Sequence, residues 1–160
     1  MKRTHMRQTH KEALALAHEF IKKFVKDEYI IAGSIRRKEA TIGDVDIVTG
    51  DKLCDIEECM LADIHVQKVR GGEKKLDVDY KGVRFNIYFA MPFYWGAMLF
   101  FLTGPASYSI AYRRMAKKKG WHLDQYGLKD EYGDVMASRT EASIYKVFGK
   151  KYKEPELRGK

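Results

Sequence analysis

Two aspartates, Asp44 and Asp46, alternate with apolar residues in a segment that otherwise has the composition of a buried strand. Side chains at positions i and i+2 of a strand point to the same face of its sheet, so the two carboxylates must lie side by side. Val45 and Ile47 then point to the opposite face, which other elements must cover. The pattern requires a sheet with one apolar, covered face and one face that carries acidic groups.

The first half of the chain contains the other elements that such a sheet needs. The spacing of apolar residues predicts an amphipathic helix over 12–25 and a short helix over 55–61. Strands are predicted over 29–32, 45–48, 64–69, 76–80 and 84–90. Lys81-Gly82 has the composition of a hairpin turn between the last two strands.

The pattern changes after Met91-Pro92, where we expect a boundary between two parts, residues 1–91 and 92–160. Helices are predicted over 93–102, 106–118 and 140–148, and short strands over 121–123 and 126–128. Pro105 is placed to open the second of these helices. The sequence therefore predicts an α+β fold, with a mixed sheet followed by a smaller α+β part.

The charge balance indicates the kind of partner. The chain has 30 Lys and Arg against 22 Asp and Glu, a net charge of +8, which favours a polyanion such as nucleic acid. Cys54 and Cys59 are too few for a zinc site or a disulfide framework. The longest apolar stretch, 91–102, is too short to span a bilayer, and 1–11 lacks the apolar core of a secretory signal. We expect a monomer without membrane association that is cytoplasmic, nuclear or in a viral factory, and not secreted.

The residues around the aspartates suit phosphate chemistry. Carboxylate pairs and substrate phosphates are the ligands that Mg²⁺ prefers. Gly33 ends a predicted strand and permits close approach of a triphosphate, while Ser34 and Arg37 offer hydrogen-bond donors to it. These residues together predict a nucleotidyltransferase site. The alternative is a plain turn at Gly33 and two aspartates that face water on an edge strand.

Four segments resemble family X DNA polymerases. Residues 33–37 and 43–47, Gly-Ser-Ile-Arg-Arg and Gly-Asp-Val-Asp-Ile, are similar to the nucleotidyltransferase signature in the form that this family uses. Residues 102–108 resemble the family's Phe-Thr-Gly nucleotide-binding turn, and 152–158 resemble its C-terminal Tyr-x-Glu-Pro-x-x-Arg ending. The resemblance extends over 29–158. It implies a polymerase-β-like palm in the first part and a nucleotide- and DNA-binding subdomain in the second.

The resemblance also implies a reaction and its site. A DNA polymerase of this family adds deoxynucleotides to primer 3′ ends in short gaps by two-metal phosphoryl transfer, so the expected partners are gapped or primed DNA and deoxynucleoside triphosphates. Asp44 and Asp46 would be catalytic and would bind Mg²⁺, with Mn²⁺ as an alternative. The nucleotide-binding positions would be Gly33, Ser34, Arg37, Phe101, Leu102, Thr103 and Gly104.

Cationic residues are the candidates for DNA binding. Arg84 and Arg113 fall where the family places an Arg beside the third carboxylate and an Arg near the template strand. Lys117, Lys118 and Lys119 close a predicted helix, where the helix macrodipole favours cations whatever the function, and they also suit contacts with DNA phosphates. About 28 residues precede the first strand, too few for the amino-terminal lyase and helix-hairpin-helix modules of larger relatives, so we expect no abasic-site lyase activity.

Asn86 departs from the family pattern. It stands at the catalytic position of the third metal-binding Asp, yet an amide carries no charge and is not a useful base. Three explanations are open: a deliberate Asp→Asn change, which we favour because the rest of the site is present, a natural loss of catalysis, or replacement by another carboxylate. Asp77 is the candidate replacement, since a two-residue turn at Lys81-Gly82 would place it opposite Asn86.

Three functions therefore compete. The first is a DNA polymerase, which 102–108 and 152–158 favour. The second is a minimal nucleotidyltransferase that acts on a substrate other than DNA. The third is a non-catalytic protein that binds DNA ends, which Asn86 makes credible.

Overall fold

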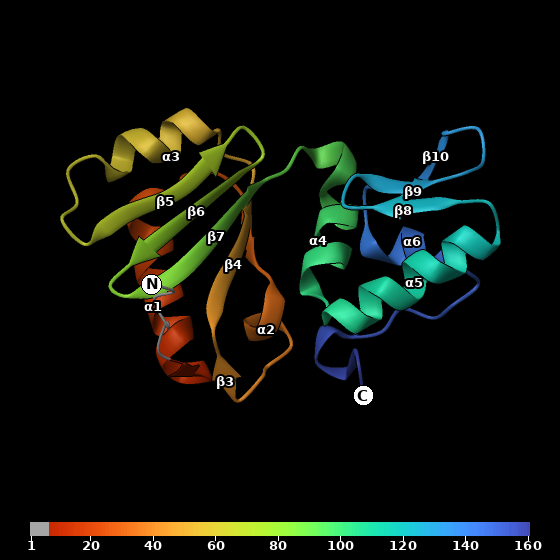
Figure 1. The fold of residues 1–160 in the computed structure, drawn as a ribbon, viewed down its shortest axis with the longest axis horizontal. Helices are drawn as coiled ribbons and strands as arrows, with labels where there is room; N and C mark the ends of the chain where they lie inside the picture. Colours follow the sequence, from red (N-terminus) through yellow and green to blue (C-terminus); the bar gives the residue numbers. More distant parts are fainter. Residues whose placement is uncertain (1–6) are drawn as a thin grey trace. The chain divides into compact units, whose positions relative to one another are not determined.

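The computed structural model describes residues 7–160, except for the side chains of Lys68 and Val69. The chain divides into two compact units, which meet between Ala90 and Met91, next to the boundary expected from the sequence. Figure 1 shows a sheet with helices in the first unit and a group of helices with a small sheet in the second. None of the described helices combines the length and the apolar character that crossing a bilayer requires.

The first unit contains a five-stranded mixed sheet in the order β2-β4-β7-β6-β5. The β4–β7 pair is parallel, and the other neighbouring strands are antiparallel. The elements are β1 (Gln8–Thr9), α1 (His10–Phe24), β2 (Tyr29–Ile31), α2 (Gly33–Arg36), β3 (Thr41–Ile42), β4 (Asp44–Thr49), α3 (Leu53–Met60), β5 (Val66–Gly72), β6 (Lys75–Tyr80) and β7 (Val83–Phe89). The predicted α+β fold with a mixed sheet is confirmed.

Helices α1 and α3 cover one face of this sheet. A capping box starts α1: the Thr9 hydroxyl accepts a hydrogen bond from the Glu12 amide, and the Glu12 carboxylate accepts one from the Thr9 amide. The apolar stripe of α1 includes Phe20, whose ring stacks on that of Phe85 with 4.3 Å between centroids. The sheet contributes its inward-facing residues, such as Ile47 and Val78, to the same core. This is the covered face that the alternation around Asp44 requires.

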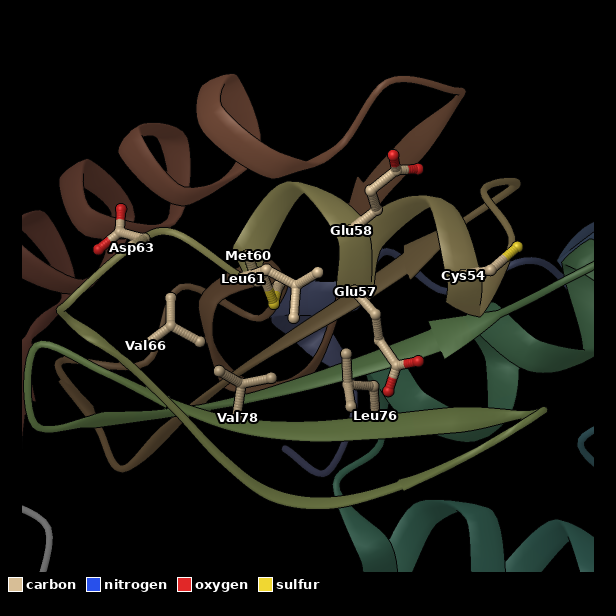
Figure 2. A pocket seen from close by; sticks show the side chains of 9 residues that line it. All are labelled: Cys54, Glu57, Glu58, Met60, Leu61, Asp63, Val66, Leu76 and Val78. Carbon is tan, nitrogen blue, oxygen red and sulfur yellow. The ribbon is translucent and has the colours of Figure 1, made fainter.

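A pocket lies between α3 and the apolar face of the sheet, although the β6 residues that line it are buried. Figure 2 shows Leu76 and Val78 on β6 and Met60 on α3 around this pocket of about 550 Å³. Alternation along β6 places Lys75, Asp77 and Asp79 on the other face of the sheet. The sheet therefore lies between this pocket and the face that carries Asp44 and Asp46.

The turn between β6 and β7 sets the register of the central strands. Lys81 and Gly82 have φ angles of 51° and 77°, the left-handed pair that a type I′ hairpin turn uses. In this register Asp77 lies directly opposite Asn86. The predicted turn and pairing are both confirmed.

The second unit joins three α-helices to a small antiparallel sheet. Its elements are η1 (Pro92–Tyr94), α4 (Trp95–Thr103), α5 (Ala106–Lys118), β8 (His122–Asp124), β9 (Gly127–Lys129), β10 (Val135–Ala137), α6 (Glu141–Val147) and η2 (Pro155–Leu157). The strand order is β10-β9-β8. Helix α4 lies close to the start of α6, since a Cβ built on Gly96 would overlap with the Thr140 backbone. Pro105 precedes the first residue of α5, as predicted.

The C-terminal segment is anchored by a buried ion pair. Arg158 is 2% exposed, and its Nη1 donates to the Glu141 carboxylate at 2.7 Å. Its guanidinium group also lies 5.8 Å from the ring centroid of Phe100 and 5.6 Å from that of Tyr145. The Arg of the C-terminal motif therefore has a structural role: it attaches the end of the chain to α4 and α6.

Candidate active site

The two aspartates lie on the sheet face opposite α1 and α3. In the parallel pair β4–β7, Asp44 lies beside Arg84 and Asp46 lies beside Asn86. Cross-strand partners share a face, so Asp44, Asp46, Arg84 and Asn86 form one polar cluster at the centre of the sheet. Arg84 is half-buried, and its buried Nε makes no hydrogen bond within residues 7–160.

Asn86 bridges the two carboxylates. Its Nδ2 donates to Asp44 Oδ2 at 3.0 Å and to Asp46 Oδ1 at 2.9 Å, and the residue is 6% exposed. The amide hydrogens therefore lie at the point between the carboxylates where a cation could contact both. The carbonyl oxygen of the same amide could bind a hard cation only if the group turned over.

The surroundings of Asp46 disfavour its charged form. Burial, and after it the negative charge of Asp44, raise the pKa of its carboxyl to about 6, although the hydrogen bond from Asn86 acts to lower this pKa. A divalent cation between the carboxylates would remove the repulsion that opposes ionisation. Two neighbouring, half-buried carboxylate groups thus fit an oxygen-preferring divalent metal.

The predicted phosphate-binding residues lie around Asp46. Gly33 has a φ of 59°, and a Cβ at this position would overlap with the Asp46 carboxylate. The Ala32 amide donates to the Asp46 carbonyl at 2.8 Å, which fixes the end of β2 beside β4. Arg37 lies near enough that its charge lowers the pKa of Asp46, and its Nε is 3.3 Å from the carboxylate of Glu39. Ser34 is half-buried in the one-turn helix α2.

Asp77 does not join this pair as a third ligand. It faces Asn86, but its carboxylate is 2.6 Å from the Lys75 ammonium group. Among residues 7–160, no three His, Cys, Asp or Glu side chains are grouped so that they could hold one metal ion. The explanation in which Asp77 replaces the missing Asp therefore has no support in this geometry.

Sequence reasoning missed two further residues of the polar face, Lys75 and Tyr88. The Lys75 Nζ lies 5.1 Å from the centroid of the Tyr88 ring. Burial raises the pKa of the Tyr88 phenol, and the charges of Asp46 and Asp77 raise it further. The alternation that placed Asn86 beside the aspartates would also have placed Tyr88 on their face, two residues further along β7.

The remaining predicted residues belong to the second unit. Thr103 is fully buried at the end of α4, Phe101 and Leu102 are half-buried, and Gly104 has a φ of 57°. The Arg113 guanidinium lies 5.6 Å from the Phe101 ring centroid. Lys117, Lys118 and Lys119 are exposed at the end of α5. Their roles in binding nucleotide or DNA stay predictions.

Comparison with known proteins agrees with these motifs. A family model described as DNA polymerase beta thumb matches residues 98–159. The repair DNA polymerases X of two African swine fever virus isolates are 30% and 29% identical to the chain, each over 85% of the chain and 84% of the viral protein. A DNA polymerase/3′-5′ exonuclease PolX of Bacillus subtilis is 28% identical over 91% of the chain but only 27% of its own length. The chain therefore belongs to the family X DNA polymerases.

Proposed function

We propose that this chain is a repair DNA polymerase that adds deoxynucleotides to a primer 3′ end in short gaps, with Mg²⁺ as its preferred cation. The carboxylate pair of Asp44 and Asp46, in which Asp46 packs on Gly33, is the observation that carries the proposal. The relatives named repair DNA polymerase X support the same reaction.

The residues of the first unit have distinct roles in this proposal. Asp44 and Asp46 would hold the cation, while Gly33 leaves room for the Asp46 carboxylate. Ser34 and Arg37 donate hydrogen bonds to the phosphates. The bound cation supplies positive charge that stabilises the phosphoryl oxygens and favours ionisation of the primer hydroxyl. For Arg37 to serve in this way, its contact with Glu39 must give way to the nucleotide.

Asn86 limits the chemistry of the site as it stands. An amide cannot take a proton from the primer 3′-hydroxyl, and it adds no charge to a cation site. The bridge from its Nδ2 to both aspartates also lies between the two carboxylates, so a cation that contacts both must displace the amide. These observations favour one other candidate function, a protein that binds DNA ends and nucleotide without efficient catalysis.

Nucleotide binding is the first test, because it needs Asp44 and Asp46 but not the third carboxylate. Calorimetric titration at pH 7.5 is expected to show binding of a deoxynucleoside triphosphate with Mg²⁺ and none with a chelator. Below about pH 6 a proton competes for Asp46, so the affinity should fall by about tenfold for each further pH unit.

Two controls make the titration specific. Asp46→Ala removes the shared ligand and should abolish the Mg²⁺-dependent heat. Glu39→Gln releases Arg37 without changing either aspartate, so it should leave Mg²⁺-dependent binding in place. If the parent protein shows no Mg²⁺-dependent heat, with or without gapped DNA, the proposed nucleotide site at Asp44 and Asp46 is wrong.

DNA affinity is expected to depend on the exposed lysines at the end of α5. Changing Lys117, Lys118 and Lys119 together to Ala should weaken binding to a gapped duplex and reduce the steepness of its salt dependence, by about 0.9 in the log–log slope for each lost phosphate contact. Fluorescence anisotropy at several salt concentrations measures both quantities. The matched control changes Lys11, Lys22 and Lys52, also exposed, to Ala. Equal losses in the two triple variants would show a net-charge effect and not a local DNA contact.

A further inference from the structure

The polar row that contains Asp46 continues to the edge of the sheet. Asn86 lies opposite Asp77 on β6, and Asp77 lies opposite Arg70 on the edge strand β5. Since cross-strand partners share a face, the row runs from Asp46 through Asn86 and Asp77 to Arg70 on one side of the sheet. The exposed Arg70 thus stands about 10 Å, two strand spacings, from Asn86.

A hollow of about 570 Å³ lies at this end of the row. It is lined by residues 70–75 and by Asp77. The lining carries three cations, Arg70, Lys74 and Lys75, and two carboxylates, Glu73 and Asp77. The net charge of the lining is therefore positive. Gly72 leaves the wall open, because a Cβ at this position would meet nothing within 4 Å.

Lys75 is held in place at the inner end of the hollow. Its ammonium group is 2.6 Å from the Asp77 carboxylate and 5.1 Å from the Tyr88 ring centroid. Its charge also acts on Asp46, whose pKa it lowers. An ammonium group can keep one carboxylate partner and still donate to a second acceptor, since it carries three hydrogens. Lys75 therefore offers a cationic donor between the carboxylate pair and the edge of the sheet.

The reaction sets the side from which each substrate reaches this face. The residues proposed for the triphosphate, Gly33, Ser34 and Arg37, follow β2, on one side of Asp46 in the strand order. In phosphoryl transfer the attacking and leaving oxygens lie roughly in line, so the primer hydroxyl must approach from the other side, over β7. The primer strand behind that hydroxyl then continues over β6 and β5.

We propose that Lys75 and Arg70 bind a backbone phosphate of the primer strand next to its 3′ end, with Asp77 as the residue that positions Lys75. The inference rests on the proposed polymerase function and goes beyond it, because it assigns a DNA contact to the β5–β6 hairpin. The contact would hold the primer terminus beside Asn86 and Asp46 whatever its base sequence.

Lys75→Gln and Arg70→Gln test this contact without the need for catalysis. Anisotropy of a gapped duplex whose primer lacks the 3′-hydroxyl should show about tenfold weaker binding for each variant, the lower range for a hydrogen bond between charged groups. Mg²⁺-dependent nucleotide binding at pH 7.5 should stay within about twofold of the parent. Lys22→Gln, an exposed change on α1, is the matched control and should bind DNA like the parent. Arg70→Gln is informative even if loss of the Lys75–Asp77 pair impairs folding, because Arg70 is exposed.

A primer with one uncharged methylphosphonate linkage locates the contact. Placed at one of the two linkages nearest the 3′ end, the methylphosphonate should weaken binding by the parent about tenfold. It should weaken binding by the two variants less than about twofold, because each variant has already lost the contact that the methylphosphonate removes. A methylphosphonate eight linkages upstream should affect parent and variants equally. Equal losses from the 3′-terminal substitution in parent and variants would overturn the inference, and so would variants that bind DNA like the parent. A parent that binds no gapped DNA would instead contradict the proposed function itself.

Discussion

Asn86→Asp is expected to raise primer extension on a gapped duplex with Mg²⁺ by at least about a hundredfold, the usual scale of a positioned general base. Asp has the shape of Asn but replaces a donor with an acceptor. The amide bridge to Asp44 and Asp46 is lost, and a third carboxylate faces the same point. The site then gains both charge for a second cation and a group able to accept the proton of the 3′-hydroxyl.

Single-turnover extension is the appropriate measurement, because slow product release cannot then mask the chemical step. A stability measurement adds an independent readout. Three adjacent carboxylates repel one another, so the Asn86→Asp protein should melt at a lower temperature than the parent without Mg²⁺ and should gain more stability when Mg²⁺ is added.

Asp77→Asn is the control for the alternative ligand. If Asp77 supplied the missing carboxylate, the parent would already extend primers, Asp77→Asn would silence it, and Asn86→Asp would change little. The ion pair between Asp77 and Lys75 leads us to expect the opposite pattern. Equal extension near background by parent and Asn86→Asp would refute the polymerase interpretation of the site and favour the DNA-end-binding function.

Gly33→Ala should have the second largest effect, a loss of at least about tenfold in Mg²⁺-dependent nucleotide affinity together with a lower melting temperature. The backbone of Gly33 is in the left-handed region, where a non-glycine residue costs about 1–2 kcal/mol. The added Cβ would also overlap with the Asp46 carboxylate, which must move away from its position beside Asp44. A displaced ligand weakens the cation site even where the protein still folds.

Gly43→Ala is the matched control, since it makes the same chemical change ten residues away. Gly43 does not have a left-handed φ, and a Cβ there would meet nothing within 4 Å. This variant should bind nucleotide like the parent. If Gly33→Ala melts earlier but binds nucleotide normally, Gly33 serves the fold alone and its proposed role at the cation site is wrong.

Elements with several turns or a clear alternation were predictable from the sequence. The capped amphipathic helix α1, the helix α5 behind Pro105 and the hairpin at Lys81-Gly82 all follow from local patterns that the tertiary structure keeps. Alternation along β4 was enough to place Asp44 and Asp46 on one face. The short elements β1, α2, β3 and β10 were not predicted, although the equally short β8 and β9 were, because two to four residues seldom show a clear period.

The sequence by itself determined which side chains share the acidic face, because alternation and a two-residue turn depend on neighbours along the chain. Only the tertiary structure decided which groups meet across elements: Asn86 bridges both aspartates of the neighbouring strand, and in the second unit Arg158 is buried against Glu141. Each of these pairings joins separate elements or depends on the exact depth of burial. No local pattern encodes that depth, since it arises only when the sheet and helices close around the groups and remove the water that would otherwise solvate them.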